Sequence, residues 1–360
     1  MKTLLRFCFV LLAGSIVSEG CDGKPRREEE KPPEVLRVST HGGAYRESQE
    51  KAFFQPYSKI MGVTVLVETQ EANLYEKLQA AVSSGEIPWD VVVTEGAVIF
   101  RAIRDGLLEP IDYTVVNKDN LFPWAANPYG VANIVYSEVL AYSTVASPAA
   151  AARPTCWRDF FDVKRFPGPR CLRAGPVGNL EIALLADGVE PEKLYPLDVE
   201  RALRKLDEIK PHVKVWWKEG AEPPKLLADG TVVLSLAYNG RIWAARQDGA
   251  PLQIEWNQGL LDNGWWVVPK GLPEERKQRA MHFIAFATRA EPQANQARII
   301  SYGPTNIYAV RKVPEDVQRD LPTEEENLKK QIRIDNEWWA QHEDAILKRW
   351  NEWKGEKAGQ

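Results

Sequence analysis

The stretch VLRVSTHGGAYRESQEKAFFQPYSKIMGVTVLVETQEANLYEKLQAAVSSGEIPWDVVVTEG (residues 35–96) decides the fold class, because strand and helix patterns alternate along it. Short apolar runs rich in β-branched residues indicate three buried strands: 35–39, 64–68 and 89–94. Apolar residues at helical spacing indicate three helices: 45–57, which we expect to end near Pro56, 74–84 and 97–105. This alternation predicts right-handed βαβ units, a parallel sheet and an α/β fold.

Polar and aromatic residues follow the first and third of these strands. His41 and Tyr45 come after the strand at 35–39, and Glu95 comes at the end of the strand at 89–94. Ligands of open α/β sheets bind beyond the carboxyl ends of the strands. We therefore expect His41, Tyr45 and Glu95 to face a binding cleft.

A second informative stretch is TVVLSLAYNGRIWAARQDGAPLQIEWNQGLLDNGWWVVPK (residues 231–270). It predicts a buried strand at 231–237, a turn at Tyr238-Asn239-Gly240 that opens a helix, and an apolar run from Trp265 that Pro269 stops. Between the two apolar runs we expect a loop that holds Asp262. Aromatic rings interleaved with carboxylates suit a cleft for a small polar or cationic ligand. Tryptophans that only fill a core, with solvated acids beside them, are the alternative.

The rest of the chain adds a long strand and several helices. We expect the strand at 133–143 and helices at 157–161, at 180–186 with Asn179 as cap and Glu181 in the first turn, at 199–209 with Asp198 as cap, at 274–288 and at 324–353. A loop is expected at 302–306.

The N-terminus has the features of an export signal. A basic start, Lys2 and Arg6, precedes a short apolar run, so we interpret residues 1–20 as a signal peptide. The sequence VSEGC (17–21) resembles the lipobox of bacterial lipoproteins, which implies lipid attachment at Cys21; plain secretion is the alternative. Residues 21–34, charged and proline-rich, are interpreted as a flexible tether.

Composition and motifs exclude several classes of function. A net charge of −4 over 360 residues argues against nucleic acid as a partner. The four histidines are scattered, and no nucleophile motif or phosphate loop occurs, so we expect no metal, no cofactor and no enzyme activity. Cys156 and Cys171 could form a disulfide, and two free thiols fit equally well.

Taken together and in order, ten segments resemble the extracellular solute-binding proteins of the spermidine/putrescine type, which serve ABC importers. The segments are VSTHGGAY (38–45), WDVVVTE (89–95), LEIALLADGV (180–189), YPLD (195–198), LLADG (226–230), YNGR (238–241), EWNQ (255–258), WWVVPKG (265–271), YGPTN (302–306) and NEWW (336–339). The resemblance implies a two-lobed type II periplasmic-binding-protein fold with two mixed, mainly parallel sheets and a hinge. It implies one lobe from 35–141 and 265–310 and the other from 142–264 and 311–360.

The resemblance also implies a set of ligand-binding residues. Carboxylates would hold ammonium groups and aromatic rings would sandwich methylenes. The implied residues are His41, Tyr45, Glu95, Glu181, Tyr238, Asn239, Asp262, Trp265 and Trp339. Two positions depart from the pattern: His41 stands where relatives often have Trp, and Gly264 where they often have Asp. The second departure makes a ligand with one amine a competitor of a diamine.

The resemblance thus implies the binding component of an ABC importer for a polyamine-like solute. The alternatives are a mono-amine, an amino-acid-derived or sugar-type solute, or, less favoured, iron(III), for which the sequence offers tyrosines but no adjacent pair. We expect a monomer in the periplasm or on the outer face of the cytoplasmic membrane, held by a lipid anchor. Its expected partners are the solute and the transmembrane subunits of an ABC permease.

Overall fold

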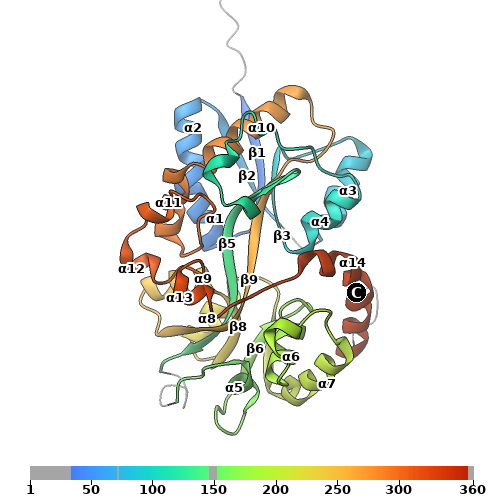
Figure 1. Ribbon diagram of the computed structural model, residues 1–360, viewed down its shortest axis with the longest axis vertical. Helices are drawn as coiled ribbons and strands as arrows, with labels where there is room; N and C mark the ends of the chain where they lie inside the picture. Colours follow the sequence, from blue (N-terminus) through green and yellow to red (C-terminus); the bar gives the residue numbers. More distant parts are fainter. Residues whose placement is uncertain (1–33, 71–72, 146–151, 356–360) are drawn as a thin grey trace, which may run out of the picture. The chain divides into compact units, whose positions relative to one another are not determined.

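Two long antiparallel strands, β5 (Gly130–Ser143) and β9 (Leu252–Val267), connect the two halves of the sheet. The computed structural model describes residues 34–70, 73–145 and 152–355. Within these residues the sheet has ten strands, ordered β2-β1-β3-β9-β5-β8-β6-β7, with β4 and β10 beside β5 and β9. Figure 1 shows β5 and β9 side by side between β1, β2 and β3 at one end and β6 at the other.

The N-terminal half of the sheet, called here the β1 half, is the predicted parallel unit. Its strands are β2 (Thr64–Thr69), β1 (Val35–Thr40) and β3 (Val91–Glu95), and β1 pairs in parallel with both neighbours. The helices α1 (Ala44–Gln49), α3 (Leu74–Ser84) and α4 (Ala97–Arg104) follow these strands in turn. The predicted α/β class and its βαβ alternation are confirmed.

The predicted end of the first helix is wrong. The chain continues past α1 through a π-helical segment, Glu50–Phe54, into α2 (Gln55–Met61). Pro56 is the second residue of α2 and directly follows the π-helical segment, so the helical run passes through the proline instead of ending there. The helix ends at Gly62 instead, whose left-handed φ of 69° suits glycine.

The other half of the sheet, called here the β6 half, is also parallel. It contains β8 (Leu234–Tyr238), β6 (Arg170–Arg173) and β7 (Val213–Trp217), with β6 in the middle. The helices that follow its strands are α6 (Asn179–Ala186), α7 (Val199–Ile209), α8 (Glu222–Ala228) and α9 (Asn239–Gln247).

Two local predictions in the β6 half need correction. Asn179 is the first residue of α6 and not its cap, because its amide donates to the carbonyls of Arg173 and Gly175, both at 2.7 Å. Asp262 lies in the middle of β9 and not in a loop, because the polar stretch between the two apolar runs continues the β5 ladder. Both errors come from polar residues that tertiary contacts place inside regular structure.

The C-terminal segment is not one helix, as predicted. It divides into α13 (Glu325–Leu328), β10 (Ile332–Arg333), which pairs with β9, and α14 (Asn336–Lys354). In α14, Trp339 and Trp350 are buried in the core of the β6 half. The outer side of α14 meets α4 of the β1 half, where Arg101 forms an ion pair with Glu343 at 2.8 Å.

Several shorter elements complete the described chain. They are β4 (Ala126–Asn127), α5 (Trp157–Phe161), α10 (Glu274–Ala287), α11 (Ala290–Ile299) and α12 (Glu315–Gln318). None of the helices described is long and apolar enough to cross a membrane. The thiols of Cys156 and Cys171 are free, which decides the open question of the disulfide. The signal peptide, Cys21 and nearly all of the tether lie outside the described residues.

The apolar core follows the two halves of the sheet. The largest cluster packs around β1, β3 and the adjoining parts of β5 and β9, with Phe53, Trp266 and Phe283 at its centre. A second cluster, with Trp157, Leu184 and Trp339, packs α6, α7 and α14 against the β6 half. This arrangement fits the two-lobed type II fold, but the two predicted sheets are joined through β5 and β9 into one mixed sheet. The lobe boundaries stated above remain a prediction.

Replacing Asp198 by Ala should destabilise the β6 half, because the Asp198 carboxylate accepts a hydrogen bond from the Arg201 amide at 3.0 Å and caps α7. We expect the free energy of unfolding to fall by about 1 kcal/mol in urea titrations. Glu208→Ala, in the exposed last turn of the same helix, is the control. It should lower the free energy of unfolding by only a few tenths of a kcal/mol. Equal losses in the two variants would contradict the capping role.

Candidate ligand-binding site

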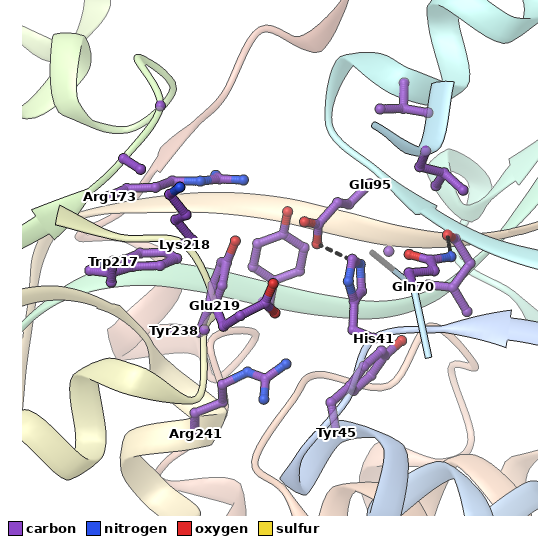
Figure 2. Close-up of a pocket in the computed structure, with 18 of the residues that line it drawn as sticks. His41, Tyr45, Gln70, Glu95, Arg173, Trp217, Lys218, Glu219, Tyr238 and Arg241 are labelled. Carbon is purple, nitrogen blue, oxygen red and sulfur yellow. Dashed lines mark hydrogen bonds and ion pairs between the residues drawn. The ribbon is translucent and has the colours of Figure 1, made fainter. Parts of the chain in front are cut away.

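A cavity of about 750 Å³ lies between the β1 half and the β6 half (Figure 2). Its lining includes the last residues of four strands, Glu95 of β3, Arg173 of β6, Trp217 of β7 and Tyr238 of β8. These strands are parallel within each half, so their carboxyl ends meet at one edge of each half of the sheet. The topology therefore brings together side chains that are far apart in the sequence.

Aromatic rings form a continuous wall along the cavity. Each ring contacts the next, with centroid distances between 5.4 and 6.2 Å, in the order His41, Tyr45, Tyr302, Tyr136, Tyr238 and Trp217. Most of these contacts are edge-to-face, a geometry that leaves ring faces available to other groups. Such a wall can hold methylene chains and cations.

The acidic side of the cavity is formed by Glu95. Its carboxylate is 27% exposed and lies 3.7 Å from Nε2 of His41. This distance is too long for a hydrogen bond, so the Glu95 carboxylate keeps its capacity to accept one from a ligand. Figure 2 shows Glu95 and His41 on the same side of the cavity.

The opposite side of the cavity carries Arg241, in the first turn of α9. Arg241 is only 9% exposed; its Nη1 donates to the Gly42 carbonyl at 3.1 Å, and its Nε has no hydrogen-bond partner in the described structure. No carboxylate of the residues described forms an ion pair with it. Burial raises the pKa of the neighbouring Tyr302 to about 12, and the positive charge of Arg241 opposes that shift. A buried guanidinium without a counter-ion is suited to bind an anion.

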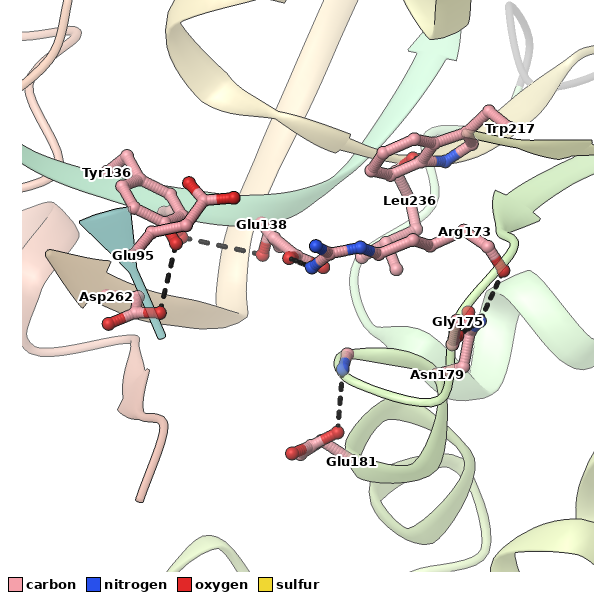
Figure 3. Close-up of polar contacts among 12 residues, drawn as sticks. Glu95, Tyr136, Glu138, Arg173, Gly175, Asn179, Glu181, Trp217, Leu236 and Asp262 are labelled. Atoms are coloured by element: carbon pink, nitrogen blue, oxygen red, sulfur yellow. Dashed lines mark hydrogen bonds and ion pairs between the residues drawn. The ribbon is translucent and has the colours of Figure 1, made fainter. Parts of the chain in front are cut away.

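A second arginine at the cavity is neutralised inside the protein. Arg173 reaches the lining from β6 and forms an ion pair with Glu138 of β5 at 2.8 Å (Figure 3). Glu138 is 1% exposed, and burial raises its pKa to about 7, although Arg173 opposes the shift. The two arginines of the cavity therefore differ: Arg173 has a carboxylate partner and Arg241 has none in the described structure.

The nine residues predicted for the site divide into two groups. Four of them line the cavity: His41, Tyr45, Glu95 and Tyr238. The other five do not: Glu181, Asn239, Asp262, Trp265 and Trp339. The polar side chains of the second group form their hydrogen bonds within the protein.

Glu181 holds its own part of the fold together. Its carboxylate accepts hydrogen bonds from the Gly178 amide at 2.8 Å and from Tyr195 and Trp339, both at 2.7 Å. Burial raises its pKa, and these hydrogen bonds oppose the shift. Its partner Trp339 is buried in the same core.

Asn239, Asp262 and Trp265 lie behind the cavity wall. Asn239 accepts from the amide of Ser137 and donates to the carbonyl of Ser301, at 2.9 and 2.8 Å. Asp262 accepts from the Tyr136 hydroxyl at 3.0 Å and therefore orients a ring of the wall. Trp265 is buried within β9.

Several aromatic and charged lining residues were not predicted as site residues from the sequence, and five of them matter most here. They are Tyr136, Arg173, Trp217, Arg241 and Tyr302. Arg173 and Trp217 end short strands, RCLR and VKVWW, whose charged residues hide the strand pattern. The rule of strand ends would have found both once these strands were assigned. Tyr136 lies within β5, where the pattern alone cannot show which face points to a cleft.

The lining offers little to a metal ion. Among the residues described, no group of three or more His, Cys, Asp or Glu side chains could hold one. Tyr45 and Tyr302 do lie in edge contact, with ring centroids 5.7 Å apart. Burial raises the pKa of both phenols, however, which disfavours the phenolates that iron(III) requires.

Comparisons with known proteins agree with this geometry. A family model described as bacterial extracellular solute-binding protein matches residues 52–323. A gamma-aminobutyric acid-binding protein of Pseudomonas aeruginosa is 40% identical over 324 residues, which are 88% of this chain and 90% of that protein. The spermidine/putrescine-binding periplasmic protein of Escherichia coli is 24% identical over 277 residues, 74% of this chain and 77% of that protein.

A solved structure is similar over nearly the whole chain. A binding protein of Agrobacterium tumefaciens R10, in complex with agropinic acid, superimposes with a TM-score of 0.81 at 38% identity. The match covers 89% of this chain and 98% of that one. The predicted periplasmic-binding-protein fold is thereby confirmed.

Replacing Glu181 by Gln should lower stability and leave solute binding unchanged. The side-chain amide of glutamine has only one acceptor oxygen. It cannot accept hydrogen bonds from the Gly178 N–H, the Tyr195 hydroxyl and the Trp339 N–H together, so at least one of these buried donors loses its partner. We expect a loss of about 1–3 kcal/mol in the free energy of unfolding, measured with urea. Glu192→Gln, at an exposed position, is the control. A tenfold weaker solute affinity with unchanged stability would instead assign Glu181 to the ligand.

The buried acids should also give stability a characteristic pH dependence. Burial raises the pKa of Glu138 to about 7 and that of Asp262 to about 6, above their ordinary values. Between the ordinary and the raised pKa the folded protein binds more protons than the unfolded chain, so the free energy of unfolding should fall as pH rises from 5 to 7.5. Urea titrations across this range should show a shallower fall in Glu138→Gln and an unchanged fall in Glu219→Gln. Equal slopes in all three proteins would contradict the shift at Glu138.

Proposed function

Because the chain belongs to the bacterial extracellular solute-binding proteins, we propose that it captures a small zwitterion with one ammonium and one carboxylate group and delivers it to an ABC permease. This proposal takes the mono-amine, amino-acid-derived alternative over the polyamine. The observation that carries it is the buried guanidinium of Arg241, which faces the cavity without a carboxylate partner among the residues described.

The carboxylate of the solute would bind Arg241. A buried charge without a partner is costly, and an anionic ligand removes that cost by forming charge-assisted hydrogen bonds. The Nε of Arg241 is buried and has no acceptor in the described structure, so the protein itself leaves this guanidinium without a full set of partners. A polyamine has no group to offer there, and its second ammonium would be repelled.

The ammonium group of the solute would bind Glu95, across the cavity from Arg241. The rings of Tyr45, Tyr136 and Tyr302 lie between the two sides and suit both the methylenes and the cation. Gly264 pairs with Glu95 across the β3–β9 ladder, and a side chain at this position would meet Oδ1 of Asn133 at 2.5 Å. The site is therefore built for one acid on this side and not for two.

The relatives support the same class of solute. The protein at 40% identity is a gamma-aminobutyric acid-binding protein, whereas the spermidine/putrescine binder is 24% identical. The cavity of about 750 Å³ is larger than a four-carbon amino acid requires. Agropinic acid, the solute named in the Agrobacterium tumefaciens complex, is therefore the second candidate.

Transport requires the two halves to close on the solute and reopen at the permease. Contacts from Glu95 on one side and Arg241 on the other would favour the closed state. We propose that the protein acts without catalysis, outside the cytoplasm, as a monomer, with Cys21 as its lipid attachment site.

Calorimetric titration of the purified protein with gamma-aminobutyric acid, agropinic acid, putrescine and spermidine tests the proposal. We expect binding of the amino acids, and a loss of about 1.5–3 kcal/mol, roughly 10- to 150-fold in Kd, in Arg241→Gln. Arg246→Gln, on the outer end of α9 and paired with Asp320, is the matched control and should bind normally. Binding of polyamines alone, or full affinity in Arg241→Gln, would contradict the zwitterion assignment.

A further inference from the structure

The Arg173–Glu138 ion pair is built into the wall of the cavity. Arg173 is the last residue of β6, its side chain is 28% exposed, and its guanidinium lies 5.7 Å from the centroid of the Trp217 ring. Glu138 lies in the middle of β5, paired on one side with Tyr238 of β8 and on the other with Leu260 of β9. The carboxylate therefore has a fixed position on the central strands.

Glu138 has no other evident structural task. Its Oε1 accepts from Arg173 at 2.8 Å, and its Oε2 is buried and has no hydrogen-bond partner in the described structure. Gly178 leaves room for this oxygen, since a Cβ atom at that position would overlap it. Gly178 also has a φ of 81°, so the loop is shaped around the carboxylate. Burying a carboxylate with one unpaired oxygen costs free energy. The role that these contacts leave for Glu138 is that of counter-ion to Arg173.

Arg173 reaches the cavity from the β6 half, across from Glu95 of the β1 half. Figures 2 and 3 both show its guanidinium extending toward Glu95, and Figure 2 shows Arg241 on the other side. Burial lowers the pKa of Arg173, but Tyr238, Glu138 and Glu95 outweigh this effect and raise it. The guanidinium would thus stand next to the carbon that bears the ammonium group of the proposed solute.

We propose that Glu138 is a specificity-determining residue: as an internal counter-ion it occupies Arg173 and restricts the solute to a single carboxylate. The inference rests on the proposed function. Arg241, without such a counter-ion among the residues described, receives the one carboxylate of the solute. A second carboxylate, placed beside the ammonium group, would meet an arginine already paired with Glu138, together with the negative charges of Glu138 and Glu95.

Gamma-aminobutyric acid and L-glutamate differ only by this second carboxylate. L-Glutamate has the skeleton of gamma-aminobutyric acid with an added carboxylate on the carbon that bears the ammonium. The wild-type protein should therefore bind gamma-aminobutyric acid far more tightly than glutamate. In Glu138→Gln, Arg173 loses its counter-ion and becomes a partner for the added carboxylate.

The test is calorimetric titration of both ligands into the wild-type protein and Glu138→Gln. We expect the ratio of the two Kd values, glutamate over gamma-aminobutyric acid, to fall at least tenfold in the variant. Glu192→Gln is the matched control: it removes the same charge from an exposed acid of the β6 half that does not line the cavity, and it should change the ratio less than twofold. A purely structural role of Glu138 would weaken both ligands equally and leave the ratio unchanged.

The possible results separate this inference from the proposed function. An unchanged ratio in a Glu138→Gln protein that binds gamma-aminobutyric acid would overturn the inference alone, as would an equal change in Glu192→Gln. Wild-type protein that binds neither amino acid would overturn the proposed function and the inference with it.

If Glu138→Gln does not fold, the same ratio can be measured on the wild-type protein from pH 8.5 to pH 5.5. Neither ligand titrates in this range, whereas Glu138, whose pKa is about 7, becomes protonated. The charged and titratable groups that face the pair are Glu181 of α6, Glu95 of β3, Asp262 of β9, Tyr136 of β5 and Tyr238 of β8. Their effects on the shared ammonium cancel in the ratio, but Asp262, whose pKa is about 6, also changes charge near the low end of this range. The fall due to Glu138 is therefore read between pH 8.5 and pH 6.5, where Asp262 stays mostly ionised. We expect the ratio to fall toward low pH, and a constant ratio would overturn the inference.

Discussion

The antiparallel pairing of β5 with β9 is the constraint on which the rest of the structure depends. These strands continue from the β1 half into the β6 half, so both parallel groups of strands are anchored to the same ladder. The carboxyl ends of β3, β6, β7 and β8 consequently open onto one cavity. The pairing also positions the buried groups of the site, because Tyr136 and Glu138 on β5 stand two residues apart on the same face of the strand, with Asp262 opposite Tyr136 on β9.

Much of the fold could be predicted from the sequence, because local patterns determine it. Strands of β-branched residues and amphipathic helices in alternation sufficed for the β1 half. The β6 half was harder to predict: Arg170–Arg173 and Val213–Trp217 are short and carry charges, and only their burial between neighbouring strands makes them regular. The C-terminal segment is divided into two helices by β10, and β10 forms only because it pairs with β9. The local sequence pattern of the segment gives no sign of this pairing.

Residues of the site could be predicted from the sequence where they lie at the carboxyl ends of strands. Glu95 and Tyr238 were found because their strands were assigned, and Arg173 and Trp217 were missed because theirs were not. Glu181 and Asp262 show the opposite difficulty. A carboxylate near a cleft can bind a ligand or satisfy buried donors, and only the positions of Tyr195, Trp339 and Tyr136 show that these two acids have protein partners. The charge balance of the cavity likewise depends on which carboxylate each arginine meets.

The contact between α4 and α14 has a consequence for how solute affinity is partitioned. Leu347, Trp350 and Asn351 of α14 line the cavity, while Arg101 pairs with Glu343 outside it. Separating the two helices would break this ion pair whichever solute is present. The contact therefore adds the same term to the free energy of closure for every solute, and changes absolute affinities without changing their order. On the proposed mechanism, selectivity lies in the charged groups of the cavity, and the tightness of retention lies partly in the Arg101–Glu343 ion pair outside it.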